Sequence, residues 1–258
     1  MNSFFIKTKL KPIQKICISG LFIALLMILN KVVALNYIPV IPFVRLTIGS
    51  GALAIFASFA LGPIYGATIC VMADIFGYLF FDPKTMGFFP TITLIYLLLG
   101  IIPYFLFCLV NQIKNKKIMI GIEYILFSLL FLGVSLFFVF NNSLSLFGTT
   151  YEFEFYQKMI IIVVLGLLLL STILINFIID KKVKNDKNVF NVYQVSFVSF
   201  VTEILVFVIF GSLMKGIAFG FNMFLAIFIS QSVVLFINVP INTYLILLTM
   251  RIGKRFII

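Results

Sequence analysis

The chain has 258 residues, of which 63% are hydrophobic and only 10% are charged. A soluble domain of this size cannot bury so much apolar surface, so the composition excludes a soluble fold and predicts a polytopic membrane protein. The formal net charge of +11 does not indicate nucleic-acid binding, because no basic patch falls on a soluble domain.

Apolar runs separated by proline, glycine and charged residues predict an all-α bundle of about eight transmembrane helices, because a helix satisfies its own backbone in lipid. The predicted helices are 13–35, 45–61, 64–81, 90–112, 118–140, 158–180, 193–214 and 222–250. The long run before Asp74 should fold back at Gly62-Pro63, since proline removes a backbone donor. The N-terminal lysines before the first run also fit a signal peptide, but no small-residue cleavage site follows, and an uncleaved helix is expected.

Basic residues predict the orientation of the bundle. They cluster before the first helix, after the fourth, after the sixth and at the end of the chain: Lys7, Lys9, Lys11, Lys15; Lys114, Lys116, Lys117; Lys181, Lys182, Lys184, Lys187; Arg251, Lys254, Arg255. With eight helices all four clusters fall on one side, which the positive-inside rule assigns to the cytoplasm. We therefore expect a multi-pass protein of the cell membrane with both termini in the cytoplasm.

The chain lacks the residue patterns of common catalytic sites. It contains no G-x-x-x-x-G-K-[ST] loop and no histidine, and no close pair of intramembrane carboxylates was found in the predicted helices. We expect neither an enzyme nor a cofactor or metal. ATP hydrolysis by the chain itself is also not expected.

Two charged residues in the first half are candidates for a binding site. Asp74 lies within the third predicted helix, either as a member of a binding cavity or as a structural hydrogen-bond partner. Arg45 opens the second helix, where it either reaches the lipid headgroups or clamps a ligand carboxylate. The Phe88-Phe89-Pro90 loop falls on the same outer side.

In the last two predicted helices, polar residues interrupt the apolar pattern. Glu203 lies near the middle of the seventh helix, while Lys215 is placed in an outer loop. Gln231, Asn238 and Asn242 form one stripe of the last helix, which should face protein or a cavity because lipid would leave their amides unsatisfied. Gln231 and Asn238 are counted among the substrate-binding residues.

The series of motifs along the chain resembles a known family. The chain has GLFIAL in the first helix, VRLTIGSGALAIFASFALGPIYGATICVMADIFGYLFF across the second and third, FFPTITL opening the fourth and VPINTYLI in the last. In order and spacing these stretches are similar to the S component, the substrate-binding membrane subunit, of an energy-coupling factor (ECF) vitamin transporter. The folate branch is nearest, followed by pantothenate.

The resemblance implies a subunit that binds folate or a related water-soluble vitamin from outside with high affinity. It would deliver the vitamin by toppling in the bilayer on a T component powered by two partner ATPases. Gly20 and Ala24 match the family's small-residue pair that contacts the T component, although simple helix packing is the alternative. Phe89, Pro90 and Thr93 match the loop and helix start that line the family's ligand pocket, and Arg45 and Asp74 match polar positions that flank it.

Family members usually have six helices, so the segment 118–188 is interpreted as an inserted two-helix hairpin. The single membrane domain, 1–258, then consists of four core helices in 13–112, the hairpin, and two core helices in 193–255. The arginine that the family carries in its last helix falls on Gln231 here. The alternative function is an autonomous secondary transporter or permease for a small solute, and a third is a membrane scaffold without a ligand.

Overall fold

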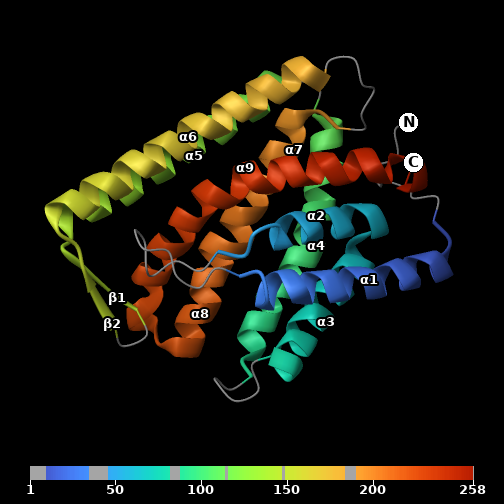
Figure 1. Ribbon diagram of the computed structural model, residues 1–258, viewed down its shortest axis with the longest axis horizontal. Coiled ribbons are helices and arrows are strands. Elements are labelled where there is room, and N and C mark those ends of the chain that lie inside the picture. Colours follow the sequence, from blue (N-terminus) through green and yellow to red (C-terminus); the bar gives the residue numbers. More distant parts are fainter. Residues whose placement is uncertain are drawn as a thin grey trace.

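The computed structural model describes residues 10–34, 46–81, 88–113, 116–146, 149–183 and 190–257. Within these ranges the chain is a bundle of helices with one small two-stranded sheet (Figure 1). The elements in the first half are α1 (Pro12–Lys31), α2 (Ser50–Leu61), α3 (Pro63–Phe81), α4 (Pro90–Gln112) and α5 (Lys116–Phe140). The second half contains β1 (Ser143–Leu146), β2 (Thr149–Glu152), α6 (Phe155–Val183), α7 (Val192–Thr202), η1 (Glu203–Phe210), α8 (Gly211–Phe219), η2 (Phe221–Met223) and α9 (Phe224–Ile257).

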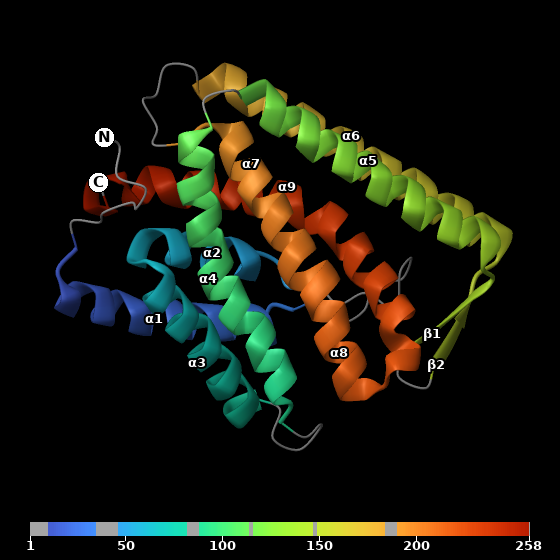
Figure 2. The same ribbon diagram turned by 180° about the vertical axis from the view of Figure 1, so that it is seen from behind.

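Seven helices of the described chain are long and apolar enough to cross a membrane. They are α1, α3, α4, α5, α6, the continuous rod formed by α7, η1 and α8, and α9 with the short η2 before it. The prediction of a multi-pass, mostly helical protein is thereby confirmed. α1 begins and α9 ends on the same side of the bundle (Figures 1 and 2).

The second predicted helix is shorter than expected. α2 has 12 residues and begins at Ser50, after Gly49 adopts a left-handed backbone with φ of +79°. At about 1.5 Å per residue this helix is about 18 Å long, less than the hydrocarbon core of about 30 Å. Two contacts show that α2 runs antiparallel to α1. Gly49, just before α2, lies beside Leu29 near the end of α1, and the carbonyl of Leu61 at the end of α2 accepts a hydrogen bond from Lys15 Nζ near the start of α1 at 3.4 Å.

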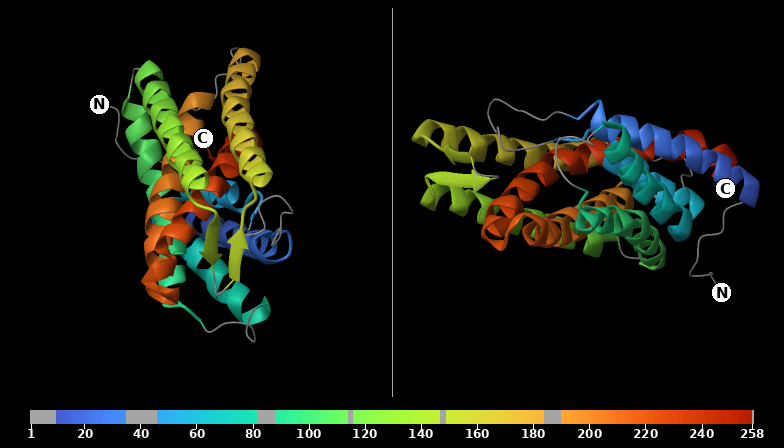
Figure 3. Two further views of the ribbon diagram at one scale, coloured as in Figure 1. Left: turned by 90° about the vertical axis from the view of Figure 1, so that its left-hand side faces the viewer. Right: turned by 90° about the horizontal axis from the view of Figure 1, so that it is seen from below.

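Residues 141–157, which join the predicted helices 118–140 and 158–180, contain an antiparallel hairpin. β1 pairs with β2 from Ser143↔Glu152 to Leu146↔Thr149. The alternation of serine with leucine in β1 suits a strand with one covered face, and Leu144 is buried. In a strand of only four residues, the alternation of polar and apolar side chains is too short to be distinguished from a loop in the sequence. This β-hairpin lies at the tip of the helix pair α5 and α6 (Figure 3).

Close contact among α2, α3 and α4 depends on two glycines. A methyl group added to Gly100 of α4 would lie 2.4 Å from the carbonyl carbon and oxygen of Gly66 in α3. Ser58 of α2 reaches the same point, and its hydroxyl donates to the carbonyl of Gly100 at 2.7 Å. Small residues therefore bring three helix backbones together, as is common in membrane bundles.

Two buried contacts attach α5 and α6 to the rest of the bundle. The ring of Phe127 in α5 stacks on Phe200 of α7 at a centroid distance of 4.7 Å and meets Phe236 of α9 edge-on at 4.9 Å. One helical turn before Phe127, Ser196 of α7 donates to Glu123 Oε1 and accepts from Asn176 of α6. We call Glu123, Asn176 and Ser196 the hairpin network. Glu123 was not singled out from the sequence, because it lies shortly after the lysines that precede the predicted helix 118–140.

Candidate functional site

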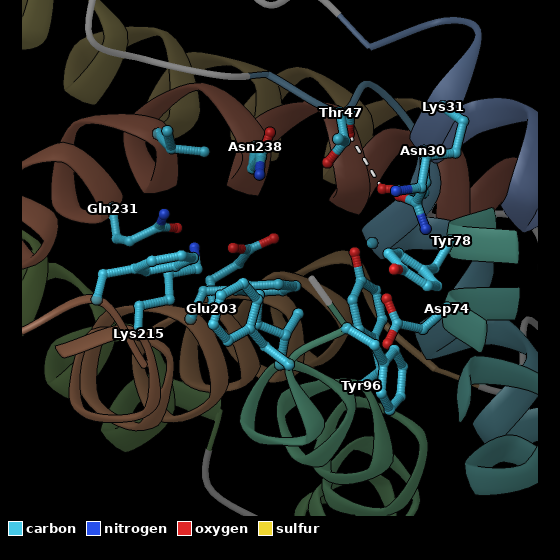
Figure 4. A pocket seen from close by; sticks show the side chains of 18 residues that line it. Asn30, Lys31, Thr47, Asp74, Tyr78, Tyr96, Glu203, Lys215, Gln231 and Asn238 are labelled. Atoms are coloured by element: carbon cyan, nitrogen blue, oxygen red, sulfur yellow. Dashed lines mark hydrogen bonds between the residues drawn. The ribbon is translucent and has the colours of Figure 1, made fainter. Parts of the chain in front are cut away.

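A cavity of about 430 Å³ lies where α1, α3 and α8 end and α2, α4 and α9 begin (Figure 4). The first five of these helices contribute side chains from within about two turns of those ends, whereas α9 contributes from positions deeper in its first half, as does η1 from the middle of its rod. The polar lining consists of charged, amide and hydroxyl groups: Lys31, Asp74, Glu203, Lys215; Asn30, Gln231, Asn238; Thr47, Ser50. Aromatic rings form most of the remaining wall: Tyr78, Phe88, Phe89, Tyr96, Phe207, Phe219.

The start of α4 fixes the aromatic part of this wall. Pro90 occupies the first position of α4, where its missing N–H removes no helical hydrogen bond and its fixed φ favours the helix. Phe89 is therefore held in an extended conformation immediately before the helix, and its ring packs on Phe219 at the end of α8 at 4.9 Å. The contact joins two helix ends beside the cavity.

Asp74 is held by the neighbouring helix. The hydroxyl of Thr93 in α4 donates to Asp74 Oδ2 at 2.8 Å, which fixes the rotamer of a carboxyl group that lines the cavity. Thr93 itself is not a lining residue. Its contribution is to position the carboxylate.

Glu203 is the most buried polar residue of the cavity wall and is 1% exposed. Its Oε1 accepts from the amide of Asn242 at 2.8 Å, and Asn242 Oδ1 accepts in turn from the backbone N–H of Ala52 at 3.1 Å. That N–H is in the first turn of α2, where it has no partner within the helix. A methyl group on Gly51 would lie 2.7 Å from Asn242 Nδ2 and 3.2 Å from Glu203 Oε1, so glycine leaves room for the chain of hydrogen bonds.

The backbone that carries Glu203 is also unusual. Glu203–Phe210 forms a π-helical segment between the two α-helical parts of the same rod, whereas a regular helix was expected. π-helical turns are rare and are frequently found at functional sites, because the extra residue per turn redirects side chains. Here the segment contributes Glu203 and Phe207 to the cavity wall.

Figure 4 shows how the charged groups are distributed around the cavity. Lys215 and Gln231 lie on one side, and Asp74 and Lys31 on the other, with Glu203 between them. A ligand in this space meets carboxylates, ammonium groups and amides within one enclosure. No group of three His, Cys, Asp or Glu side chains in the described part of the chain is arranged to hold a metal ion.

The predicted site residues lie in different places. Asp74, Phe89, Gln231 and Asn238 line the cavity, whereas Pro90 and Thr93 do not: Pro90 directly follows Phe89, and Thr93 hydrogen-bonds Asp74. Gly20 and Ala24 lie elsewhere, on the exposed face of α1. Arg45 lies outside the described residues. Asn242 faces the protein interior behind Glu203 and does not line the cavity.

Several cavity residues were not predicted from the sequence, and three of them are charged or amide side chains. Lys215 was assigned to an outer loop, but it lies in α8 and lines the cavity. Asn30 and Lys31, at the end of α1, were not singled out. Polar residues at the ends of membrane helices usually face the headgroups, so their type and position alone do not reveal a shared cavity.

The cavity and the basic clusters lie at opposite ends of the bundle. Lys15 is in the first turns of α1 and Lys117 at the start of α5, while Lys181 and Arg251 are near the ends of α6 and α9. By contrast, the cavity takes residues from the end of α1 and the first half of α9. The chain matches no protein-family model, no curated protein and no solved structure in the three comparisons made.

Proposed function

We propose that this chain is the vitamin-binding S component of an ECF-type importer, with folate or a related water-soluble vitamin as its ligand. The observation that carries the proposal is the cavity of about 430 Å³ at one end of a multi-pass bundle. Concave sites with apolar and aromatic walls and a few convergent polar groups are typical of small-molecule binding. The resemblance in motifs supplies the family.

The lining supports a ligand with both hydrogen-bond donors and anionic groups. Asp74 and Glu203 offer carboxylates for ligand N–H groups, and Lys31 and Lys215 offer cations for ligand carboxylates. The aromatic residues beside them suit a flat heterocyclic ring. With Gln231 in place of the family's arginine, the two lysines are the cations that we assign to an anionic ligand.

The position of the cavity supports uptake from outside the cell. The positive-inside rule places the basic ends of α1 and α9 in the cytoplasm. The cavity then faces outward, as is required of a subunit that captures a scarce solute. Both termini are cytoplasmic in this arrangement.

Energy for transport is assigned to partner proteins. The chain has no P-loop, so the T component and two ATPases of the proposed complex would supply ATP hydrolysis. The exposed face of α1, with Gly20 and Ala24 between exposed aliphatic residues, is the surface proposed to contact the T component. Small residues allow close approach of a partner helix.

Ligand binding is tested by the melting temperature of the purified protein in detergent with folate, pantothenate, riboflavin, thiamine, biotin or a queuosine precursor added. A ligand at a hundred times its Kd stabilises the folded state by about 2.7 kcal/mol, so one of these compounds should raise the melting temperature clearly. No shift with any compound, and no association with a T component, would contradict the proposal. A scaffold without a ligand gives that result.

The source of energy is tested by uptake into proteoliposomes. We expect accumulation of the ligand only when the T component and both ATPases are present with ATP. Accumulation by vesicles containing this chain alone, without nucleotide, would instead identify an autonomous transporter.

A further inference from the structure

A second concave surface lies between α6 and α9, at the end of the bundle away from the cavity. It is a groove of about 570 Å³. The cavity uses Gln231–Asn238 of α9, whereas this groove uses positions farther along the same helix. All but one of the lining residues are aliphatic or aromatic: Ile175, Ile178, Ile179, Tyr244, Leu247, Leu248, Arg251.

The groove changes from apolar to cationic along its length. On α9, Tyr244, Leu248 and Arg251 are three or four residues apart and so lie on one helix face. Arg251 is the first charged residue of α9, and on α6 the isoleucines of the groove are followed directly by Asp180 and Lys181. On both helices the apolar residues are thus followed by charged residues toward the C-terminal end, as expected where the hydrocarbon core meets the headgroup region.

Arg251 is available to an anionic group. The residue is exposed, and among the described residues no carboxylate forms an ion pair with it. Its planar guanidinium suits a phosphate, which it can bind through two parallel hydrogen bonds. Lys181, near the end of α6, supplies a second cation, and its ammonium lies 4.4 Å from the ring centroid of Phe177.

We propose that this groove binds an anionic glycerophospholipid, such as phosphatidylglycerol, with an acyl chain between α6 and α9 and its phosphate on Arg251. Basic pockets between transmembrane helices on the cytoplasmic side are suited to anionic lipid headgroups. The lipid fills the space between the α5–α6 hairpin and the last helix, where Ile175 of the groove directly precedes Asn176 of the hairpin network. The proposal does not depend on the identity of the ligand in the cavity.

The absence of tryptophan from the sequence allows a direct test. Leu248→Trp places a single fluorophore in the groove, and Leu174→Trp places one on the exposed surface of α6. Each variant is reconstituted in vesicles containing either brominated phosphatidylglycerol or brominated phosphatidylcholine at equal mole fraction. Bromine on the acyl chain quenches tryptophan on contact. We expect phosphatidylglycerol to quench Leu248→Trp at least twofold more strongly, and both lipids to quench Leu174→Trp equally.

The charge assignment is tested by adding Arg251→Gln to Leu248→Trp, which should abolish the preference, while Arg251→Lys should retain part of it. Equal quenching of Leu248→Trp by both lipids would overturn the proposal. A preference that survives Arg251→Gln, or that is equally strong at Leu174→Trp, would do so as well. If Leu248→Trp does not fold, Tyr244→Trp replaces one half-exposed aromatic residue of the groove with another and gives the same readout.

Discussion

Glu203 shows how a carboxyl group can be buried inside a bundle of membrane helices. The residue is 1% exposed, and one of its oxygens is satisfied by Asn242, which also binds the backbone of α2. Burying a carboxylate is costly unless it is hydrogen-bonded, and Asn238 of the cavity wall is a second hydrogen-bond partner of Glu203. We infer that an N–H or cationic group of the ligand adds to these contacts from within the cavity.

Glu203→Gln is expected to weaken ligand binding while the protein remains folded. The amide has nearly the same shape and can still accept from Asn242, but it lacks the charge. A hydrogen bond to a charged group contributes about 1.5–3 kcal/mol, which corresponds to a loss in affinity of about 10- to 150-fold. Titration calorimetry with the ligand identified by thermal shift measures the change.

Glu123→Gln is the matched control for this prediction. Glu123 is also 1% exposed and within a transmembrane helix, but it does not line the cavity. Ligand affinity should therefore be unchanged. An equal loss in the two variants would show that the effect comes from general destabilisation and would contradict a direct role for Glu203.

The sequence allowed prediction of some cavity residues and not of others, for a physical reason. Asp74, Gln231 and Asn238 interrupt apolar runs, where lipid would leave their polar atoms unsatisfied, so a cavity or protein contact was expected. Lys31 and Lys215 lie near helix ends, where a cation can equally reach the headgroups. Only the three-dimensional packing of six helix ends distinguishes these two environments.

Among the helical elements, the contact between α3 and α4 requires glycine on both sides. Gly100→Ala places a methyl group 2.4 Å from the carbonyl of Gly66, so the two backbones must separate. Overpacking of this kind costs about 1–3 kcal/mol, and the hydrogen bond from Ser58 to the Gly100 carbonyl should weaken too. The predicted result is a clear fall in melting temperature in detergent.

Gly133→Ala provides the comparison on α5, where an added methyl group meets no atom within 4 Å. Alanine favours a helix over glycine, so this variant should melt at the same temperature as the parent or higher. Similar destabilisation by both substitutions would argue that loss of glycine flexibility, and not the close helix contact, causes the effect.

Helix ends marked by proline were the elements predicted most accurately. The third and fourth helices were predicted at 64–81 and 90–112, and the structure has Pro63–Phe81 and Pro90–Gln112. Proline at the first helical position defines both starts. The second helix was extended too far, because the apolar character before Ser50 does not reveal that Gly49 takes a left-handed backbone.

The exposed face of α1 leads to a prediction about transport. An added side chain at Gly20 meets no atom within 4 Å, so Gly20→Leu should leave folding and ligand affinity intact. In the proposed complex the added bulk prevents close approach of the T component. We expect reduced uptake by the complete transporter in proteoliposomes, together with loss of the T component in a pull-down.

Gly133→Leu makes the same change on the exposed surface of α5 and should not reduce uptake. Loss of transport in both variants would contradict α1 as the docking surface. If Gly20→Leu loses ligand binding as well, the residue belongs to the support of the cavity and not to an interface.

In the molecule as a whole, polar contacts determine how the α5–α6 hairpin is attached to the bundle. Phe127 supplies apolar contact with two core helices, but apolar surface alone gives little preference between helix and lipid. The hairpin network gives that preference, because Glu123 would lose its hydrogen-bond donor, Ser196, if the α5–α6 hairpin moved into lipid. Ser196 of the core is the residue that both Glu123 and Asn176 contact.

Ser196→Ala should therefore destabilise the protein more than loss of one hydroxyl would suggest. Glu123 Oε2 already lacks a hydrogen-bond partner in the described part of the chain, and the substitution removes the donor to Oε1 as well. An unsatisfied buried group costs about 1–3 kcal/mol, so the melting temperature should fall while ligand affinity is unchanged.

Combining Ser196→Ala with Glu123→Leu and Asn176→Leu removes the unsatisfied groups, and replacement of a whole buried polar network is often neutral or stabilising. Recovery of the melting temperature in this triple variant is the expected outcome, whereas an additive further loss would mean that the network stabilises the hairpin outright.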